Sequence, residues 1–512
     1  MPVDPIVVLH ALTYLAGAML LGSVLFLLFL VRPLGWLLGE AGLRLDRDVA
    51  RIAGWSAQAL VVCIVATLLL QGSGRAAELT PPDLSDDAFV TISTAGAAAA
   101  WLMALLLAIR WAPGVLLLPL GAVVLAAATL TSQAAAGPAQ PQVLLAITAL
   151  HLFGAAIWVG GIPAFLAALV RLRDGVSWHA VGVRFARMAV LGVAAILLSG
   201  AALAWLDVTG AEGDPTAFYG TAFGNLVSVK IVLVVALLAL GLGNLGTLRR
   251  LAARPGTPVT RMKRFAEVQI GLGISLFCVA AALAPLPPPV DQPQDRVTWQ
   301  QMLAEARPAW PRLSNPFAQP TTTTAIVSAS ALDVLPAAGP DDTVAWAGLF
   351  ALAIGLLALL HRAGLQTARH WPLLLLPLAA LLLVRADPAA WPLGPGAAWQ
   401  DVRYPAALPQ RLLAVLLVLL ALIEWGAPRR RFLPRLLLPL ATAAGGVVLL
   451  TSASADALTA LLWVPLGLLG VGAGWTRWLE LWLDPYQARW AGWVWPVCCV
   501  AIGVLLLTYP VA

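Results

Sequence analysis

Long apolar stretches separated by short loops dominate this sequence of 512 residues. About 20 apolar residues in a helix cross the hydrocarbon core of a bilayer, and a span inside lipid must hydrogen-bond its own backbone. Only 11% of the residues are charged, against about 25% in soluble proteins. The sequence therefore predicts an all-α polytopic membrane protein in a lipid bilayer, with about 14 transmembrane helices near Pro5–Val31, Ile52–Leu70, Val90–Ile109, Pro113–Thr131, Val143–Val170, Phe185–Leu206, Phe223–Leu242, Val268–Pro285, Val344–Leu360, Trp371–Val384, Pro409–Glu424, Pro434–Leu450, Ala457–Trp475 and Trp490–Thr508.

The basic residues indicate how these spans are oriented. Of the 31 Lys and Arg residues, 23 lie in one set of alternate loops and 6 in the other, while Lys230 and Arg411 lie inside or at the edge of spans. Short loops rich in Arg and Lys stay in the cytoplasm. Both termini are therefore predicted to face away from the cytoplasm. The net charge of +6 is interpreted as topology, and no nucleic-acid partner is expected.

The first eight spans contain an internal repeat. Gly22, Phe26 and Arg32 of the first span each have an identical residue 139 positions further on, in the fifth span. Because four spans are an even number, the two halves would have parallel topology, as in some transporters. The predicted organisation is an eight-helix membrane domain over residues 1–290, a Pro-rich linker outside the cytoplasm over 291–342, and a six-helix membrane extension over 343–512.

The fifth span, HLFGAAIWVGGIPAFLAALVR from His151 to Arg171, carries an imidazole near its start. Ionisable side chains inside a membrane are costly and mark functional sites by default. Trp158 lies seven residues on and shares a helix face with His151, and the glycines at 160 and 161 would let a neighbouring helix come close. The alternative is a helix-packing motif whose His only hydrogen-bonds a neighbour.

Other polar side chains lie at a similar predicted depth. His10, His151 and Lys230 each follow the start of a span that runs inward by about five to eight residues, or roughly 8–12 Å at the helical rise, and Gln133 closes the fourth span on the same side. Met19 lies deeper, nine residues beyond His10. Imidazole and thioether ligands together suit copper, and thioethers particularly the cuprous ion. A neighbouring Lys230 would repel a cation unless an acidic residue of the outer loop before the seventh span pairs with it, and Asp207, Glu212 and Asp214 are the candidates.

Residues 181–285 resemble the copper resistance protein D (CopD) family. The resemblance rests on RFARMAVLGVAAILLSGAALAWL, on AFGNLVSVKIVLVVALLALGLGN and on Glu267 opening the last span. HLFGAAIWVGG resembles the family's H…WxGG helix, and the first span resembles its first helix. Residues 291–512 look like the extension fused to longer members.

This resemblance implies copper import from periplasm to cytoplasm across a bacterial inner membrane, with both termini periplasmic and a CopC-like periplasmic copper carrier as partner. Copper would be the bound ion. His10, His151, Trp158 and Lys230 match family positions, so His10 and His151 are the candidate metal ligands, with Trp158, Lys230, Gln133 and Met19 lining the site. Where family members often show a GHA-like segment, this chain has Ser132-Gln133-Ala134, and its outer side has fewer imidazoles than the family pattern.

Two classes of function remain open. One is a copper transporter. The other is a membrane copper-binding or assembly factor that acts at the periplasmic face without translocating the ion. An enzyme is not expected, because the sequence has no phosphate loop and no zinc-type His/Glu spacing.

The basic-residue pattern predicts the location of the C-terminus. A reporter fused at Ala512 should be active only when the reporter works in the periplasm. Activity of a cytoplasmic reporter at the same position would mean that the number of spans is odd.

Overall fold

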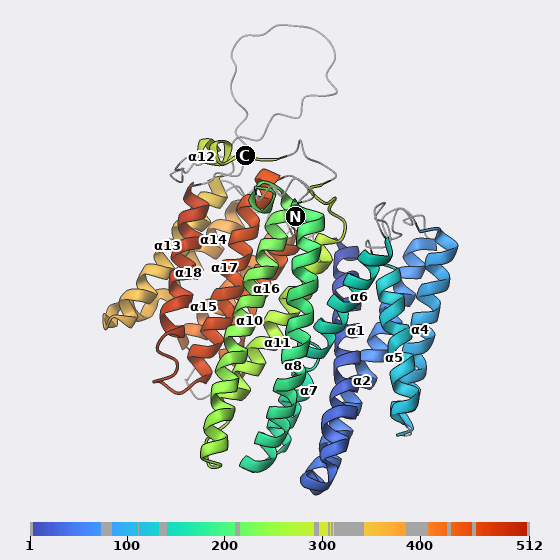
Figure 1. Cartoon of the computed structure of the whole chain (residues 1–512). Helices are drawn as coiled ribbons and strands as arrows, with labels where there is room; N and C mark the ends of the chain where they lie inside the picture. Colours follow the sequence, from blue (N-terminus) through green and yellow to red (C-terminus); the bar gives the residue numbers. More distant parts are fainter. Residues whose placement is uncertain are drawn as a thin grey trace, which may run out of the picture. The chain divides into compact units, whose positions relative to one another are not determined.

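The computed structural model describes residues 4–72, 84–110, 112–132, 141–209, 216–290, 296–305, 308, 311, 342–385, 408–426, 432–452 and 457–508. Every regular element in these residues is helical (Figure 1). In this described part, eight helical segments are long and apolar enough to cross a membrane, and the first of them, Pro5–Leu70, contains two of the predicted spans. The predicted all-α polytopic membrane fold is confirmed.

The chain folds as two compact units. The first unit comprises Met1–Val297 with Val447–Val464, and the second comprises Thr298–Gly446 with Pro465–Ala512. Most of the Pro-rich segment predicted at 291–342, and Gln133, lie outside the described residues.

The main helices of the first unit are α1 (Pro5–Phe26), α2 (Gly35–Leu70), α4 (Asp86–Ala108), α5 (Gly114–Leu130), α6 (Pro141–Trp158), α7 (Ile162–Arg171), α8 (Gly175–Ala204), α10 (Ala222–Ala253) and α11 (Thr260–Leu283). Short turns of other helix types extend α1 (η1, Leu27–Val31, and η2, Arg32–Leu34) and α8 (η5, Trp205–Thr209), and α9 (Ala217–Gly220) precedes α10. Helix α1 packs against α2, α5, α6, α7 and α11. It is therefore the helix around which this unit is assembled.

The join between α1 and α2 explains why the two form one continuous segment. Pro33 lies in the 3-10 turn that ends the first span, and Gly39 breaks the following helix with φ of +52°. A positive φ suits glycine because it has no Cβ. The chain therefore turns back within a few residues, as the two predicted spans require.

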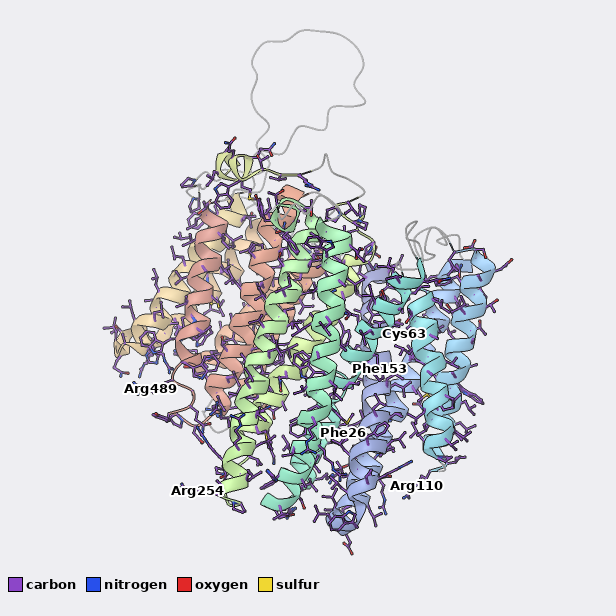
Figure 2. The ribbon with its side chains drawn as sticks, in the orientation of Figure 1. Phe26, Cys63, Arg110, Phe153, Arg254 and Arg489 are labelled. Atoms are coloured by element: carbon purple, nitrogen blue, oxygen red, sulfur yellow. The ribbon has the colours of Figure 1, made fainter. Side chains whose placement is uncertain are left out.

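Basic residues gather at one end of the first unit. Figure 2 shows Arg110, after α4, and Arg254, after α10, at this same end. Arg171 at the end of α7 forms an ion pair with Asp48 of α2, and Arg51 lies 3.6 Å from the same carboxylate. This clustering agrees with the alternation of basic loops in the sequence.

Helix α1 crosses the end of α6 and the turn that follows it at a contact made almost entirely of backbone. A Cβ atom at Gly160 would lie 2.0 Å from the carbonyl oxygen of Ala18, and one at Gly22 would lie 2.3 Å from the carbonyl oxygen of Ala156. No side chain larger than hydrogen fits at either glycine. The predicted close approach of a neighbouring helix to the Gly160-Gly161 pair is confirmed, and the neighbour is α1.

Residues matched in the predicted repeat meet at this crossing. A Cβ atom at Gly22 would lie 2.5 Å from the backbone nitrogen of Gly161. One turn further on, the rings of Phe26 and Phe165 both pack against Phe185 of α8, with centroids 5.8 and 4.6 Å away. Contact between matched positions is what a two-fold axis between parallel halves would produce. These contacts support the 4+4 repeat, which stays a prediction.

The second unit contains α13 (Asp342–Arg362), η6 (Gln366–Leu374), α14 (Leu375–Arg385), α15 (Leu408–Gly426), most of α16 (Phe432–Thr451) and α17 (Ala457–Trp482), and α18 (Ala491–Thr508). The rings of Trp371 and Trp495 pack in its core, 5.1 Å apart. Beside them, Glu480 of α17 accepts hydrogen bonds from Arg362, Arg477 and the Trp495 indole, and Arg477 also pairs with Glu424. The charges of this network, two arginines and two glutamates, balance within the unit.

The backbone contact at the α1–α6 crossing makes a stability prediction. Gly160→Ala should destabilise the protein by about 1–3 kcal/mol, because the added methyl group must push α1 and α6 apart. The bulkier Gly161→Leu should also lower folded yield. The readouts are the thermal midpoint and the yield of folded protein in detergent.

Gly17→Ala is the matched control, since a Cβ atom at Gly17 of α1 would meet nothing within 4 Å. That variant should melt at or slightly above the wild-type temperature, because alanine is the better helix former. Unchanged melting of Gly160→Ala would show that the crossing is not a tight contact.

Candidate functional site

His151 lies on α6 and faces α8. Its Nδ1 atom is 3.0 Å from the hydroxyl oxygen of Ser199, and a Cβ atom at Gly200 would lie 3.3 Å from its Cε1. One turn further along α6, Gly154 packs against the backbone of Gly192. The small residues of α8 thus make room for the imidazole, and Ser199 supplies its polar contact.

The hydrogen bonds of Ser199 indicate which nitrogen of His151 carries the lone pair. The Ser199 hydroxyl donates to the carbonyl oxygen of Ala195, 2.5 Å away. With its only proton used there, the hydroxyl accepts from Nδ1–H of the neutral imidazole. The lone pair of His151 then resides on Nε2, the form in which a histidine binds a metal while its other nitrogen is held by a hydrogen bond.

Lys230 of α10 belongs to the same polar cluster. It lies close enough to interact electrostatically with His151 and with Asp207 of η5. Asp207 is one of the outer-loop acids that the sequence offered as a partner for this lysine, and Glu212 and Asp214 lie outside the described residues. A carboxylate near the ammonium reduces the repulsion that Lys230 would exert on a cation at His151.

His10 lies on α1 in a separate environment. Its ring stacks on Tyr14 with centroids 6.3 Å apart, and Asp4, which caps α1 by accepting from the backbone of Ile6, interacts with it electrostatically. Its Nδ1 atom is buried and has no hydrogen-bond partner among the described residues. A buried polar atom without a partner is costly, so this nitrogen is available to a ligand.

The two histidines lie at similar levels before the α1–α6 crossing, and His151 faces away from α1. His10 precedes Ala18 by eight residues and His151 precedes Gly160 by nine, about 12 and 13.5 Å at the helical rise. However, Ala156, which faces α1, lies about 140° around α6 from His151 at 100° per residue. His151 therefore points away from α1 toward α8. One ion shared between both imidazoles stays a prediction.

The other predicted lining residues differ in position. Trp158 is buried at the end of α6, next to the break before α7. Met19 is half-buried in α1, about 13 Å deeper than His10 at the helical rise. Gln133 lies outside the described residues. Among the described residues, neither Trp158 nor Met19 forms a hydrogen bond with His151. The polar cluster at His151 comprises Ser199, Lys230 and, next to the lysine, Asp207.

These donors limit the kind of metal site that is possible. Among the described residues, no three His, Cys, Asp or Glu side chains come together as a metal-binding group. The unpartnered Nδ1 of His10 and the free Nε2 of His151 nevertheless fit an imidazole-binding metal such as copper. Each histidine can supply one protein ligand, and further ligands would have to come from outside this set.

A second polar pair lies deeper in the bundle. Asn244 of α10 donates through Nδ2 to the Oε1 atom of Gln269 on α11, 3.2 Å away, and Gln269 donates to the carbonyl oxygen of Leu237. The Oδ1 atom of Asn244 is buried and has no hydrogen-bond partner in the described part of the chain. Fourteen residues separate Lys230 from Asn244, or about 21 Å along α10.

Ser199 was not identified from the sequence. Its signal is a Ser-Gly pair inside an apolar span, where serine can hydrogen-bond across helices and glycine admits a neighbouring side chain. Many membrane helices contain such pairs, and only the structure shows that this one faces His151.

Comparison with known proteins adds independent information. The family description "Copper resistance protein D" (CopD) matches residues 179–283, which include Ser199, Asp207, Lys230, Asn244 and Gln269. No curated protein and no solved structure matches the chain. The match agrees closely with the resemblance found at residues 181–285. Residues 179–283 of this chain are therefore similar to the copper resistance protein D family.

Proposed function

We propose that the protein imports copper from the periplasm to the cytoplasm across a bacterial inner membrane, receiving it from a CopC-like periplasmic carrier. The observation that carries the proposal is His151, held by Ser199 so that Nε2 is free, beside residues of a copper-resistance family. In the proposed orientation both termini are periplasmic, and the cluster at His151 lies in the outer half of the membrane.

In this cluster the hydroxyl, ammonium and carboxylate groups already interact with one another or with His151. A cuprous ion from a carrier could therefore bind the imidazole without breaking these interactions. Ser199 fixes the imidazole, and Asp207 compensates Lys230. Histidine held by a second hydrogen bond is oriented toward its metal and made more basic. An ion that binds Nε2 would therefore not have to break a hydrogen bond between His151 and Ser199.

Asn244 and Gln269 support a route toward the inner side. Their amide oxygens could contact an ion that has left the outer cluster, and Asn244 Oδ1 has no partner among the described residues. Between the two polar levels, Leu233 and Leu237 of α10 are buried. An ion would pass this apolar zone only if the helices around α10 moved.

The same apolar zone favours the alternative function. A protein that binds or delivers copper at the periplasmic face needs the outer cluster and no route past Leu233 and Leu237. The two functions therefore differ in transport, and they share the copper site.

The first experiment tests the site. His151→Ala should lower the affinity of the purified protein for cuprous ion by at least about 100-fold. Ser199→Ala should lower it about 10–100-fold, which is the usual effect of removing a residue that hydrogen-bonds the other ring nitrogen of a metal-binding histidine. Affinity is measured by competition with a chromogenic cuprous chelator. His179→Ala on α8 is the control and should leave the affinity unchanged; an unaffected His151→Ala variant would refute the site.

The same assay with His10→Ala tests the shared ion. If one ion bridges both imidazoles, His10→Ala should abolish binding as completely as His151→Ala does. If His10→Ala keeps full affinity at one copper per protein, the predicted sharing is wrong and His151 binds without it.

A second experiment tests transport. Proteoliposomes that contain a cuprous chelator should accumulate copper over time when copper is supplied outside, and His151→Ala should abolish this uptake. If copper binds in a stoichiometric amount but never reaches the internal chelator, the protein is a binding or assembly factor.

A further inference from the structure

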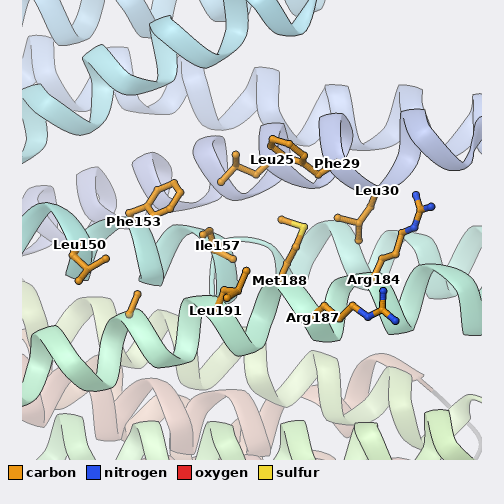
Figure 3. Close-up of a pocket in the computed structure, with 11 residues that line it drawn as sticks. Leu25, Phe29, Leu30, Leu150, Phe153, Ile157, Arg184, Arg187, Met188 and Leu191 are labelled. Carbon is orange, nitrogen blue, oxygen red and sulfur yellow. The ribbon is translucent and has the colours of Figure 1, made fainter.

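A groove of about 490 Å³ lies between η1 with the end of α1, α6 and α8 (Figure 3). Most of its lining is apolar, including Leu25, Phe29, Phe153, Ile157 and Leu191. Phe29 is 52% exposed and Leu191 is 68% exposed, so the groove opens at the surface of the first unit. In a chain that spans a membrane, this surface faces lipid.

Two arginines stand at one end of the groove. Arg184 and Arg187 lie one turn apart on α8, and Figure 3 shows both beyond Met188, away from Leu150 and Phe153. Neither arginine has an ion pair with a carboxylate among the described residues. Both belong to the loops and helix ends predicted to be cytoplasmic.

The length of the groove matches one leaflet of a bilayer. From Arg184 to Ala195, its limits along α8, eleven residues rise about 16 Å. The hydrocarbon core of a bilayer is about 30 Å thick, so one leaflet accounts for about half of it. A chain that enters beside the arginines and runs along Met188, Leu191 and Ile157 would therefore end near the middle of the membrane.

The turn that contributes Phe29 and Leu30 is also unusual. Residues Leu27–Val31 form a π-helical turn at the end of α1. Such turns are rare inside α-helices and frequently occur at functional sites. Here the turn places one exposed and one buried apolar side chain on the wall of the groove.

We propose that this groove binds one anionic phospholipid of the cytoplasmic leaflet. Arg184 and Arg187 hold the phosphate, because guanidinium groups bind phosphate through paired hydrogen bonds, and one acyl chain occupies the apolar groove. Basic pockets between transmembrane helices on the cytoplasmic side bind anionic headgroups in this way. The arginines lie at the end of the groove away from the copper cluster, with Arg187 twelve residues before Ser199 on α8, or about 18 Å at the helical rise. The proposal does not depend on the proposed copper function.

Native mass spectrometry of the full chain in mild detergent tests the proposal, with phosphatidylglycerol and phosphatidylcholine of identical acyl chains as probes. The wild type should retain one phosphatidylglycerol in preference to phosphatidylcholine. The double variant Arg184→Gln/Arg187→Gln should lower the affinity for phosphatidylglycerol roughly 30-fold and leave phosphatidylcholine binding unchanged.

Arg249→Gln/Arg250→Gln is the matched control, because it removes the same charge from an exposed pair at the end of α10. It should bind phosphatidylglycerol like the wild type. Leu191→Trp, at an exposed position on the groove wall, should weaken retention of both lipids by occupying the space of the acyl chain. Equal weakening by both arginine pairs would show a general effect of charge and overturn the proposal.

A third arm distinguishes a lipid from a free anion. Millimolar inorganic phosphate should not displace the bound phosphatidylglycerol, because phosphate lacks the acyl chain that the groove holds. Displacement by phosphate, or the appearance of a dimer that excludes lipid, would overturn the proposal.

Arg184→Lys/Arg187→Lys retains both charges, so lipid binding by that variant at an intermediate affinity would confirm that the glutamine variant lost binding through charge and not through misfolding.

Discussion

The first unit depends on the backbone contact between α1 and α6. At Ala18, Gly22 and Gly160 the two helices approach so closely that only hydrogen fits between them. Lipid offers apolar side chains the same environment as the protein interior, so close packing of small residues takes the place of hydrophobic burial. Because α1 also packs against α2, α5, α7 and α11, this crossing joins α6 to the helix that those four helices contact.

The same crossing places the polar groups. The face of α6 that meets α1 carries Ala156, and the opposite face carries His151. Tight contact with α1 therefore turns the imidazole toward α8, where Ser199 and Gly200 receive it. Below the crossing, α1 continues as a π-helical turn whose residues line the arginine-ended groove. The groove extends from the two arginines as far as Leu150 and Ala195, which lie next to His151 and Ser199 of the polar cluster.

The sequence predicted the helical class, the close approach at Gly160 and the acidic partner of Lys230, because each depends on local composition or spacing. It could not predict that Ser199 contacts His151, 48 residues away. Helices in a membrane are apolar on all sides, so hydrophobic periodicity does not determine how far each one is rotated. The predicted pairing of His10 with His151 assumed that similar depth implies facing side chains, and depth alone leaves the rotation of both helices open.

The two units use their polar groups differently. In the second unit, Arg362 and Arg477 are matched by Glu424 and Glu480, and Trp495 donates to Glu480. Such a network satisfies its own charges and specifies one arrangement of helices. In the first unit, Nδ1 of His10 and Oδ1 of Asn244 are buried and have no hydrogen-bond partner among the described residues. A membrane interior makes every unsatisfied polar atom costly, so a ligand that contacts these two atoms would remove that cost. The second unit also has a buried histidine nitrogen without a hydrogen-bond partner among the described residues, at His361. The proposed copper site at His151 therefore rests on the imidazole, on its Ser199 partner and on the family match at residues 179–283, because unpaired polar atoms do not distinguish the two units.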